Sequence, residues 1–293
     1  MTTTSHDDTF WIGGDLPIRR MGFGAMQLTG TGVWGPPSDP QNARTVLRRA
    51  VELGVNFIDT ADVYGPGDNE KLIREALHPY PQGLVIGSKA GMVRSGPATR
   101  ENPGITLDGS EAHIRNALEG SLRDLGVDVI DLYQLHRVDP ATPIEETMRV
   151  FRALREEGRI RHIGLSGVTV EQIERARAVV EIATVQNVYS LAIRRHGDEL
   201  LYCDRNGIGF IPFWPLHLEH LTGSEVLARI ADEAAATTSQ VALAWLLKKS
   251  AVTILIPGTS SVAHLEENVA AGDVGLSDAQ MLELDRIGAT DGA

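Results

Sequence analysis

Short apolar runs typical of β-strands alternate with helix-like segments along almost the whole chain, and this alternation constrains the fold more than any other feature. The strand candidates are residues Met21–Ala25, Asn56–Asp59, Leu84–Lys89, Val129–His136, His162–Ser166, Thr184–Gln186, Gly209–Phe213 and Thr253–Ile256. Strands that alternate with helices form parallel sheets, and eight such units predict an α/β fold closed into a (β/α)8 TIM barrel.

The segments between these runs carry apolar residues at the three- and four-residue spacing of an amphipathic helix. Two such series are Ile114, Leu118, Leu122, Leu125 and Ile144, Met148, Phe151, Leu154. A doubly wound open sheet is the alternative fold. The residues after the first strand begin Gly-Phe-Gly-Ala-Met-Gln, however, which departs from the Gly-x-Gly-x-x-Gly turn of that fold.

We therefore expect one barrel domain spanning residues 1–293, with a short disordered N-terminus over about residues 1–8. The apolar run Phe10–Ile12 and the turn Gly13–Asp15 predict a β-hairpin that plugs the bottom of the barrel. No linker rich in Pro, Gly or Ser divides the chain. Residues Thr29–Pro40, Met92–Thr106 and Leu216–Ser224 are interpreted as rim loops over a site.

Charge and composition narrow the possible partners. With 39 acidic and 27 basic residues the formal net charge is −12, which disfavours a nucleic-acid partner. The longest unbroken apolar run, Val241–Leu247, is too short to span a membrane. A single cysteine, Cys203, excludes an intrachain disulfide and a cysteine-based metal cluster. These features favour a cytoplasmic enzyme that acts on a small molecule; they leave the oligomeric state open.

Four polar residues follow three successive strands of the predicted barrel. Asp59, Lys89 and His136 close their strands, and Tyr64 lies in the loop five residues after Asp59. The carboxyl ends of barrel strands meet at one rim, so we expect these side chains to converge there. Taken singly, each has a plainer interpretation as a turn, packing or surface residue; their conjunction favours a site.

An acid, a phenol, an amine and an imidazole together indicate proton-transfer chemistry. An ammonium near a phenol lowers the phenol's pKa from about 10, and we expect Lys89 to do so for Tyr64. Asp59 then keeps Lys89 charged, and His136 donates a hydrogen bond to a substrate oxygen. The set contains no nucleophile and no obvious metal ligands, so the electrons of a redox reaction must come from a cofactor.

The remaining strand ends suit such a cofactor. Ser166 and Gln186 offer hydrogen bonds to a carboxamide such as that of nicotinamide. An aromatic segment, Phe213–Leu216, offers a surface for stacking on a flat ring. Small residues at Gly258–Ser261 precede a predicted helix near His264, an arrangement typical of anion sites.

Taken in order, these segments closely resemble the aldo-keto reductase family over roughly residues 9–287. They are Asp59–Tyr64, Ser88-Lys89, Leu135–Arg137, Gly164–Ser166, Val185–Asn187 and Ile256–Asn268. Within the family, Arg20–Leu28 and Gly32–Pro37 look most like bacterial reductases associated with pyridoxal reduction.

The resemblance implies an NADP(H)-dependent reductase of aldehydes. Tyr64 would be the general acid, Lys89 and Asp59 its electrostatic support, and His136 the residue that orients the carbonyl. NADPH would lie across the rim with its nicotinamide on Phe213. The implied cofactor contacts are Gly24, Ala25, Met26, Ser166, Gln186, Phe213, Trp214, Pro215, Leu216, Pro257, Gly258, Thr259, Ser260, Ser261, His264, Glu267 and Asn268.

Several positions depart from the family's common pattern. Gly167 stands where the family often has Asn, Trp214 where it more often has Ser, and His217-Leu218-Glu219 where Gly-Arg-Gly is common. Gly258 and His264 replace the basic pair that commonly holds the 2′-phosphate. Thr259, Ser260 and Ser261 remain available for that phosphate, so we expect a preference for NADPH over NADH.

The substrate pocket is expected to favour a small aromatic or apolar aldehyde. Its expected walls are Trp34, Val63, Met92, Trp214 and Leu218, with Arg137 beside them. Arg137 is open to two interpretations, attraction of an anionic substrate or a structural salt bridge. Two other functions remain as alternatives: an NADP(H)-binding barrel that reports redox state with little turnover, and a metal-dependent barrel hydrolase. No His-x-His follows the first strand to support the second.

Overall fold

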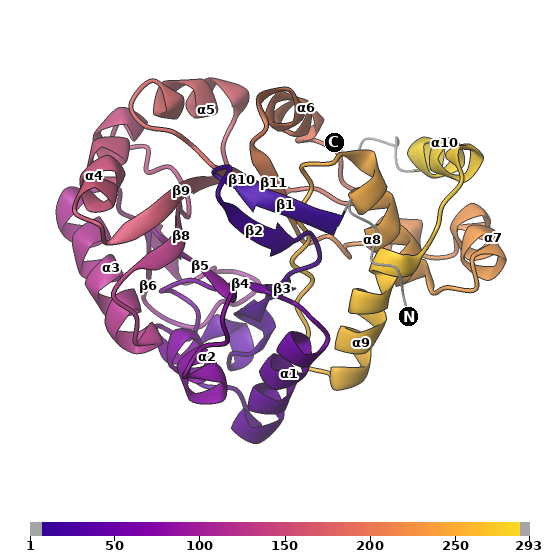
Figure 1. Ribbon diagram of the computed structural model, residues 1–293, viewed down its shortest axis with the longest axis horizontal. Helices are drawn as coiled ribbons and strands as arrows, with labels where there is room; N and C mark the ends of the chain where they lie inside the picture. The colour runs from indigo at the N-terminus through magenta and orange to yellow at the C-terminus, as the bar shows by residue number, and fades with distance from the viewer. Residues whose placement is uncertain (1–7, 288–293) are drawn as a thin grey trace.

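The computed structural model describes residues 8–287 and shows strands enclosed by a ring of helices (Figure 1). The strands are β1 Thr9–Ile12, β2 Leu16–Arg19, β3 Phe23–Gly24, β4 Phe57–Asp59, β5 Val85–Ala90, β6 Met92–Arg94, β7 Ile105–Leu107, β8 Ile130–Leu135, β9 Ile160–Ser166, β10 Thr184–Val188 and β11 Gly209–Phe213. The helices are α1 Pro40–Glu52, α2 Asp68–Leu77, α3 Glu111–Leu125, α4 Ile144–Glu156, α5 Val170–Arg177, α6 Gly197–Asn206, α7 Glu225–Glu233, α8 Thr238–Lys249, α9 Val262–Ala270 and α10 Asp278–Ile287.

Seven strands form one parallel sheet in the order β11-β10-β9-β8-β5-β4-β3. The eighth predicted strand, Thr253–Ile256, forms two parallel bridges instead of a regular ladder, Phe210 to Thr253 and Met21 to Leu255. These bridges join the two edges of the sheet and close the barrel. The prediction of a TIM barrel is confirmed. Its last strand pairs with its neighbours through isolated bridges and not through the continuous ladder that the sequence indicated.

The N-terminal hairpin plugs the barrel as predicted. Strands β1 and β2 pair antiparallel, and Figure 1 shows them lying across the barrel opening. Ile12, Leu16 and Ile18 are buried against inward-facing strand residues such as Phe57 and Leu132. The disordered stretch expected over about residues 1–8 lies outside the described residues, apart from Asp8, whose backbone carbonyl accepts a hydrogen bond from the Arg20 backbone NH.

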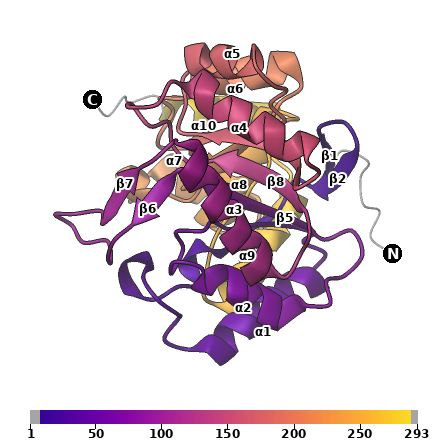
Figure 2. The same ribbon diagram turned by 90° about the vertical axis from the view of Figure 1, so that its left-hand side faces the viewer.

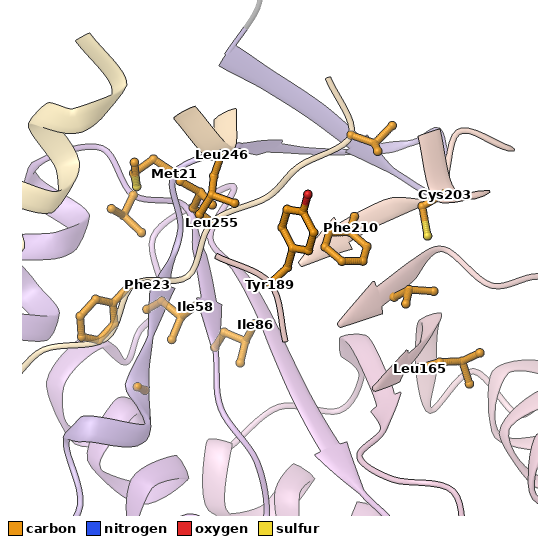
Figure 3. Close-up of a cluster of buried hydrophobic side chains, with 14 of the residues drawn as sticks. Met21, Phe23, Ile58, Ile86, Leu165, Tyr189, Cys203, Phe210, Leu246 and Leu255 are labelled. Atoms are coloured by element: carbon orange, nitrogen blue, oxygen red, sulfur yellow. The ribbon is translucent and has the colours of Figure 1, made fainter. Parts of the chain in front are cut away.

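Outward-facing strand residues pack beneath the helices and form the main core, part of which Figure 3 shows. Both predicted helical series are confirmed, because all eight of their apolar residues are buried on α3 and α4. Helix starts follow from local capping: Asp39 accepts a hydrogen bond at the start of α1 and Ser110 at the start of α3. Cys203 is fully buried in this core, and burial raises its pKa to about 12.

One expectation about the rim is wrong. Residues Met92–Thr106 are not a simple loop, because Met92–Arg94 pairs antiparallel with Ile105–Leu107 in the β6–β7 hairpin. Figure 2 shows this hairpin at the end of the barrel opposite the β1–β2 plug. The sequence did not reveal it because its strands are three residues long and are separated by a Gly- and Pro-containing loop. The hairpin forms a wall beside the carboxyl ends of the strands, where the predicted site lies.

Candidate active site

Three adjacent parallel strands bring the predicted catalytic residues together. Asp59 ends β4, Lys89 lies near the end of β5, and His136 directly follows β8. In the sheet β4 pairs with β5 and β5 with β8, and Lys89 stands opposite Gln134 in the register. Side chains that alternate inward along these strands therefore meet at one level inside the barrel mouth.

Lys89 is at the centre of the cluster. Its Nζ donates hydrogen bonds to Asp59 Oδ2 at 2.5 Å, to the Thr60 carbonyl at 2.8 Å and to Tyr64 Oη at 3.5 Å. The Lys89 side chain is fully buried and that of Asp59 is 3% exposed. His136 completes the group, because its ring meets the Tyr64 ring edge-on with centroids 5.9 Å apart. All four predicted catalytic residues are thus brought together.

The electrostatics of the cluster follow from burial and these pairings. Burial alone would lower the pKa of Lys89, but the Asp59 carboxylate beside it raises that pKa above its usual value, so the ammonium stays charged. The pKa of His136 lies well below 6.5 because burial and the nearby cations Lys89, Arg137 and Arg94 disfavour the imidazolium. His136 is therefore a neutral hydrogen-bonding group at neutral pH.

The expectation for the pKa of Tyr64 needs a correction. Lys89 does lower it, but burial raises it more strongly and Asp59 adds to that rise, so the net pKa lies above 10. Tyr64 consequently keeps its proton at neutral pH. A phenol that is protonated at rest and sits 3.5 Å from an ammonium is arranged to donate that proton and then to have its phenolate stabilised.

Two buried amides hold the other oxygen of the Asp59 carboxylate. Gln134 Nε2 donates to Asp59 Oδ1 at 3.0 Å, and Gln186 Nε2 donates to the same oxygen at 3.1 Å. Gln134 was not among the residues predicted for the site. The alternation of strand residues contains the signal, since Gln134 stands two residues before His136 and so faces the same side of the strand.

A cavity of about 490 Å³ opens above this cluster. Asp59, Tyr64 and His136 contribute to its walls. The other predicted residues that line it are Gly24, Met26, Met92, Arg137, Ser166, Gln186, Phe213, Trp214, Pro215, Leu216, Pro257 and Gly258. The lining also includes His217, noted above as a departure from the family pattern, and Gln27, Arg94, Ile105 and Ile256, which were not predicted as site residues.

The other predicted residues lie outside this lining. Ala25 is fully buried, Val63 is buried beside Tyr64 and Met92, Trp34 is 40% exposed, and Leu218 packs against the main core. The remaining residues of the implied cofactor contacts follow Gly258 along the chain into α9. They are Thr259, Ser260, Ser261, His264, Glu267 and Asn268.

The start of α9 is built by short-range hydrogen bonds. Ser261 caps the helix by accepting a hydrogen bond from the His264 backbone NH at 3.4 Å, and Asn42 Nδ2 donates to the Ser260 carbonyl at 2.7 Å. Glu267 accepts a hydrogen bond from the Thr237 hydroxyl at 2.5 Å. Ser260 and His264 are exposed at the start of α9.

Arg137 lies between the polar and aromatic walls of the cavity. Its Nη1 donates to Ser166 Oγ at 2.7 Å and to the His136 carbonyl at 2.8 Å, and its guanidinium stands 5.1 Å over the Phe213 ring. The salt-bridge interpretation is not supported, because no Asp or Glu among residues 8–287 pairs with it. Gly167 makes room for the side chain, since a Cβ there would lie 2.7 Å from Arg137 Cδ.

The aromatic wall contains one unusual backbone conformation. Trp214 has a positive φ of 56°, which is rare for a bulky residue, and its side chain is 54% exposed. Its ring meets Phe213 edge-on at 5.5 Å and stacks near His217 at 6.0 Å. Strain of this kind collects where a side chain must be presented to a ligand.

Within the described part of the chain, no group of three or more His, Cys, Asp or Glu side chains is arranged to hold a metal ion. None of the helices described is long and apolar enough to cross a membrane.

Comparison with known proteins gives this geometry its context. The model of the aldo/keto reductase family matches residues 20–289. A pyridoxine 4-dehydrogenase of Escherichia coli is 43% identical over 286 residues, covering 96% of this chain and 98% of its own. An uncharacterized oxidoreductase of Schizosaccharomyces pombe is 44% identical over 281 residues, covering 96% and 90%.

Solved structures agree with this assignment. A glycerol dehydrogenase of Gluconobacter oxydans matches with a TM-score of 0.83 and 26% identity over 96% of this chain and 95% of that one. An aldo-keto reductase of Klebsiella pneumoniae in complex with NADPH matches with a TM-score of 0.80 and 26% identity over 98% and 96%. The barrel, the cluster at its mouth and these matches together show that the chain is an oxidoreductase of the aldo/keto reductase family.

Proposed function

We propose that this protein reduces a small aldehyde to the primary alcohol with NADPH, Tyr64 donating the proton. The observation that carries the proposal is the contact of Tyr64 Oη with the buried, Asp59-paired Lys89 at 3.5 Å, on the wall of a cavity. The E. coli relative, named as a pyridoxine 4-dehydrogenase, supports a small aromatic aldehyde such as pyridoxal as the substrate.

The cavity's donor set suits a nicotinamide cofactor. Ser166 Oγ and the Gln186 amide are the kinds of group that pair with a carboxamide, and the Phe213 ring offers a stacking face. Gly24 and Gly258 both line the cavity and lie close together, because a Cβ on Gly258 would be 2.7 Å from the Gly24 carbonyl oxygen. That contact excludes a basic side chain at position 258. The residues proposed to bind the 2′-phosphate are therefore Thr259–Ser261 and His264.

The proton side of the reaction follows from the cluster itself. NADPH, when bound, supplies a hydride to the carbonyl carbon. Tyr64 gives its proton to the carbonyl oxygen as negative charge develops there, and Lys89 stabilises the phenolate that remains. His136, neutral at this pH, donates a hydrogen bond that orients the carbonyl oxygen toward Tyr64. Asp59 holds Lys89 charged throughout, and solvent returns the proton to Tyr64.

The test is NADPH oxidation, followed by absorbance, with pyridoxal, 4-nitrobenzaldehyde, methylglyoxal and a simple aldose. Tyr64→Phe keeps the ring but removes the donor, so kcat is expected to fall by at least about 100-fold, the lower range for general acid catalysis. Binding of NADPH, measured by fluorescence titration, is expected to persist. A Tyr64→Phe protein with full turnover would refute the assignment, and NADPH binding without turnover of any aldehyde would favour the redox-reporting alternative.

A further inference from the structure

Two guanidinium groups face the cavity without an acidic partner. Arg94 and Arg137 both line it, and neither forms an ion pair with any Asp or Glu among residues 8–287. Several arginines on the outer surface are ion-paired instead: Arg49, Arg115 and Arg175 each contact two carboxylates. The two guanidinium groups at the cavity therefore carry positive charge that no carboxylate among residues 8–287 compensates, in a chain whose formal net charge is −12.

Neutral groups hold Arg94 in place. Its Nε donates to the Val63 carbonyl at 2.9 Å and its Nη1 to the Pro103 carbonyl at 3.2 Å. These bonds fix the guanidinium plane between the segment that carries Tyr64 and the β6–β7 hairpin. They use two of the five N–H donors of the guanidinium and cancel none of its charge.

Arg137 is held in the same way, by the Ser166 hydroxyl and the His136 carbonyl. Burial lowers the pKa of both guanidinium groups, which shows that part of their solvation has been lost. An arginine nevertheless stays protonated in proteins. Two partly desolvated cations without a counter-ion are costly, and an anionic group between them would offset that cost.

The other lining residues do not neutralise this charge. Asp59 is the one carboxylate among the residues that line the cavity, and it is paired with Lys89. His136 is neutral, because its pKa lies well below 6.5. The cavity thus presents a net positive face beside the proton donor.

Arg94 stands on the substrate side of the barrel mouth. Counted around the barrel from β3, β5 is the third strand, and the β6–β7 hairpin that carries Arg94 follows it. The proposed cofactor residues at this end follow the seventh strand, β11, and the eighth, Thr253–Ile256. The third and seventh positions lie opposite one another in a closed eight-stranded barrel. Figure 2 shows the β6–β7 hairpin projecting at this end of the molecule. Arg94 therefore comes from a different part of the barrel rim than the segments proposed to bind the cofactor.

We propose that Arg94, together with Arg137, makes the site select aldehydes that carry an anionic oxygen group, a carboxylate or a phosphate monoester, apart from the reacting carbonyl. The anionic group takes the free N–H donors of Arg94 and leaves the carbonyl at Tyr64 and His136. It remains unchanged in the reaction, which is the same hydride and proton transfer as before. The inference rests on the proposed aldehyde reduction.

The test compares matched substrates. 4-Carboxybenzaldehyde is paired with methyl 4-formylbenzoate, which has nearly the same shape without the charge, and 4-formylphenyl phosphate is paired with 4-methoxybenzaldehyde. The wild-type protein is expected to show a kcat/KM at least about 10-fold higher for one or both anionic aldehydes than for their neutral partners, mainly through a lower KM. A hydrogen bond to a charged group contributes enough binding free energy for a difference of this size. The two pairs distinguish a carboxylate from a phosphate preference.

The variants locate the preference. Arg94→Met is expected to reduce kcat/KM for the preferred anionic aldehyde by about 10-fold more than for its neutral partner, and Arg94→Lys to retain part of the difference. Arg137→Met is expected to act in the same direction. Arg149→Gln, an exposed residue on α4, removes the same charge far from the cavity and is expected to leave the ratio unchanged. Equal losses for charged and neutral substrates in Arg94→Met would give Arg94 a structural role and overturn the proposal.

A binding measurement supplies a readout that needs no turnover. Calorimetric titration with 4-carboxybenzyl alcohol is expected to show weaker binding to Arg94→Met than to the wild-type protein, with 4-methoxycarbonylbenzyl alcohol bound alike by both. Turnover without any preference for anionic aldehydes would reject this inference alone. Absence of turnover with every aldehyde would reject the proposed function instead, and the titration would still decide whether Arg94 binds the anion.

Discussion

Gln134 Nε2 lies 3.0 Å from Asp59 Oδ1, and both side chains are buried inside the barrel. This bond and the one from Gln186 fix the carboxylate that keeps Lys89 charged. Gln134 therefore acts on Tyr64 only through Asp59 and Lys89, as a positioning residue. Its removal should affect catalysis more than cofactor binding.

We expect Gln134→Met, which preserves volume, to lower kcat by about 10-fold, because a hydrogen bond to a charged group contributes about 1.5–3 kcal/mol. The dissociation constant of NADPH should change little. Tyr133→Phe is the matched control, since Tyr133 is the adjacent buried residue and faces outward against Phe151. Steady-state kinetics and NADPH titration check this, and equal effects of both variants would contradict it.

The buried Lys89–Asp59 pair makes a prediction about stability. Lys89→Met leaves the Asp59 carboxylate buried without its partner, which should cost about 3–5 kcal/mol of unfolding free energy. Adding Asp59→Asn removes the uncompensated charge and should recover most of the lost unfolding free energy. Neither the single nor the double variant should reduce aldehydes. Urea denaturation measures both values. A double variant no more stable than Lys89→Met would argue against this account.

Because the pKa of Glu70 is raised in the folded protein, we expect the free energy of unfolding to fall as pH rises. Burial raises its pKa from 4.5 to about 7, and Asp124 adds to the rise while Ser88, Ser121 and Lys89 oppose it. The folded protein therefore binds this proton more tightly than the unfolded chain. The stabilisation is fully present below pH 4.5 and is lost as pH rises through 7, amounting to roughly 3 kcal/mol.

Glu70→Gln removes this titration. Unfolding free energies measured at pH 5 and pH 8 should differ less in the variant than in the wild-type protein. The pKa of Asp62 is raised well above its usual value by burial and further by Glu70, so Asp62 contributes in the same direction in both proteins and less in the variant. Equal differences in the two proteins would show that Glu70 is not the group responsible.

The protonation state of His136 leads to a prediction for how kcat/KM depends on pH below neutrality. Because its pKa lies well below 6.5, the imidazole remains neutral through the range in which an exposed histidine would become charged. We expect kcat/KM for aldehyde reduction to show no acid limb centred near 6.5. Measurements between pH 5 and pH 8 check this, and an inflection near 6.5 that disappears in His136→Gln would contradict it.

Cofactor preference should depend on the edge of the cavity at α9. Ser260 and His264 have exposed side chains there, and a basic residue is excluded from position 258 by the Gly24 carbonyl. We expect the double variant Ser260→Ala, His264→Ala to reduce the ratio of kcat/KM with NADPH to kcat/KM with NADH by at least about 5-fold. The reason is the loss of hydrogen bonds to the 2′-phosphate, which NADH lacks. An unchanged ratio would refute the phosphate assignment.

Local patterns in the sequence were sufficient for the barrel and its four central residues. Strand and helix periodicities depend on neighbours a few residues apart, so the alternation from Met21 to Ile256 predicted the topology directly. The carboxyl ends of parallel barrel strands share one rim, so the positions of Asp59, Lys89 and His136 at strand ends predicted that they lie together. The N-terminal hairpin followed in the same way from a short apolar run and a Gly-Gly turn.

The sequence by itself thus determined the fold, the family and the cluster of Asp59, Tyr64, Lys89 and His136, because these rest on spacing and residue type. The tertiary structure alone decided quantities that depend on distances between remote segments. Burial raises the pKa of Tyr64 more than Lys89 lowers it, and Gln134 donates a hydrogen bond to Asp59 from another strand. The β6–β7 hairpin brings Arg94 to the Val63 carbonyl, next to Tyr64 in the chain. Desolvation and Coulomb interactions vary with separation in space, which no local pattern in the chain encodes.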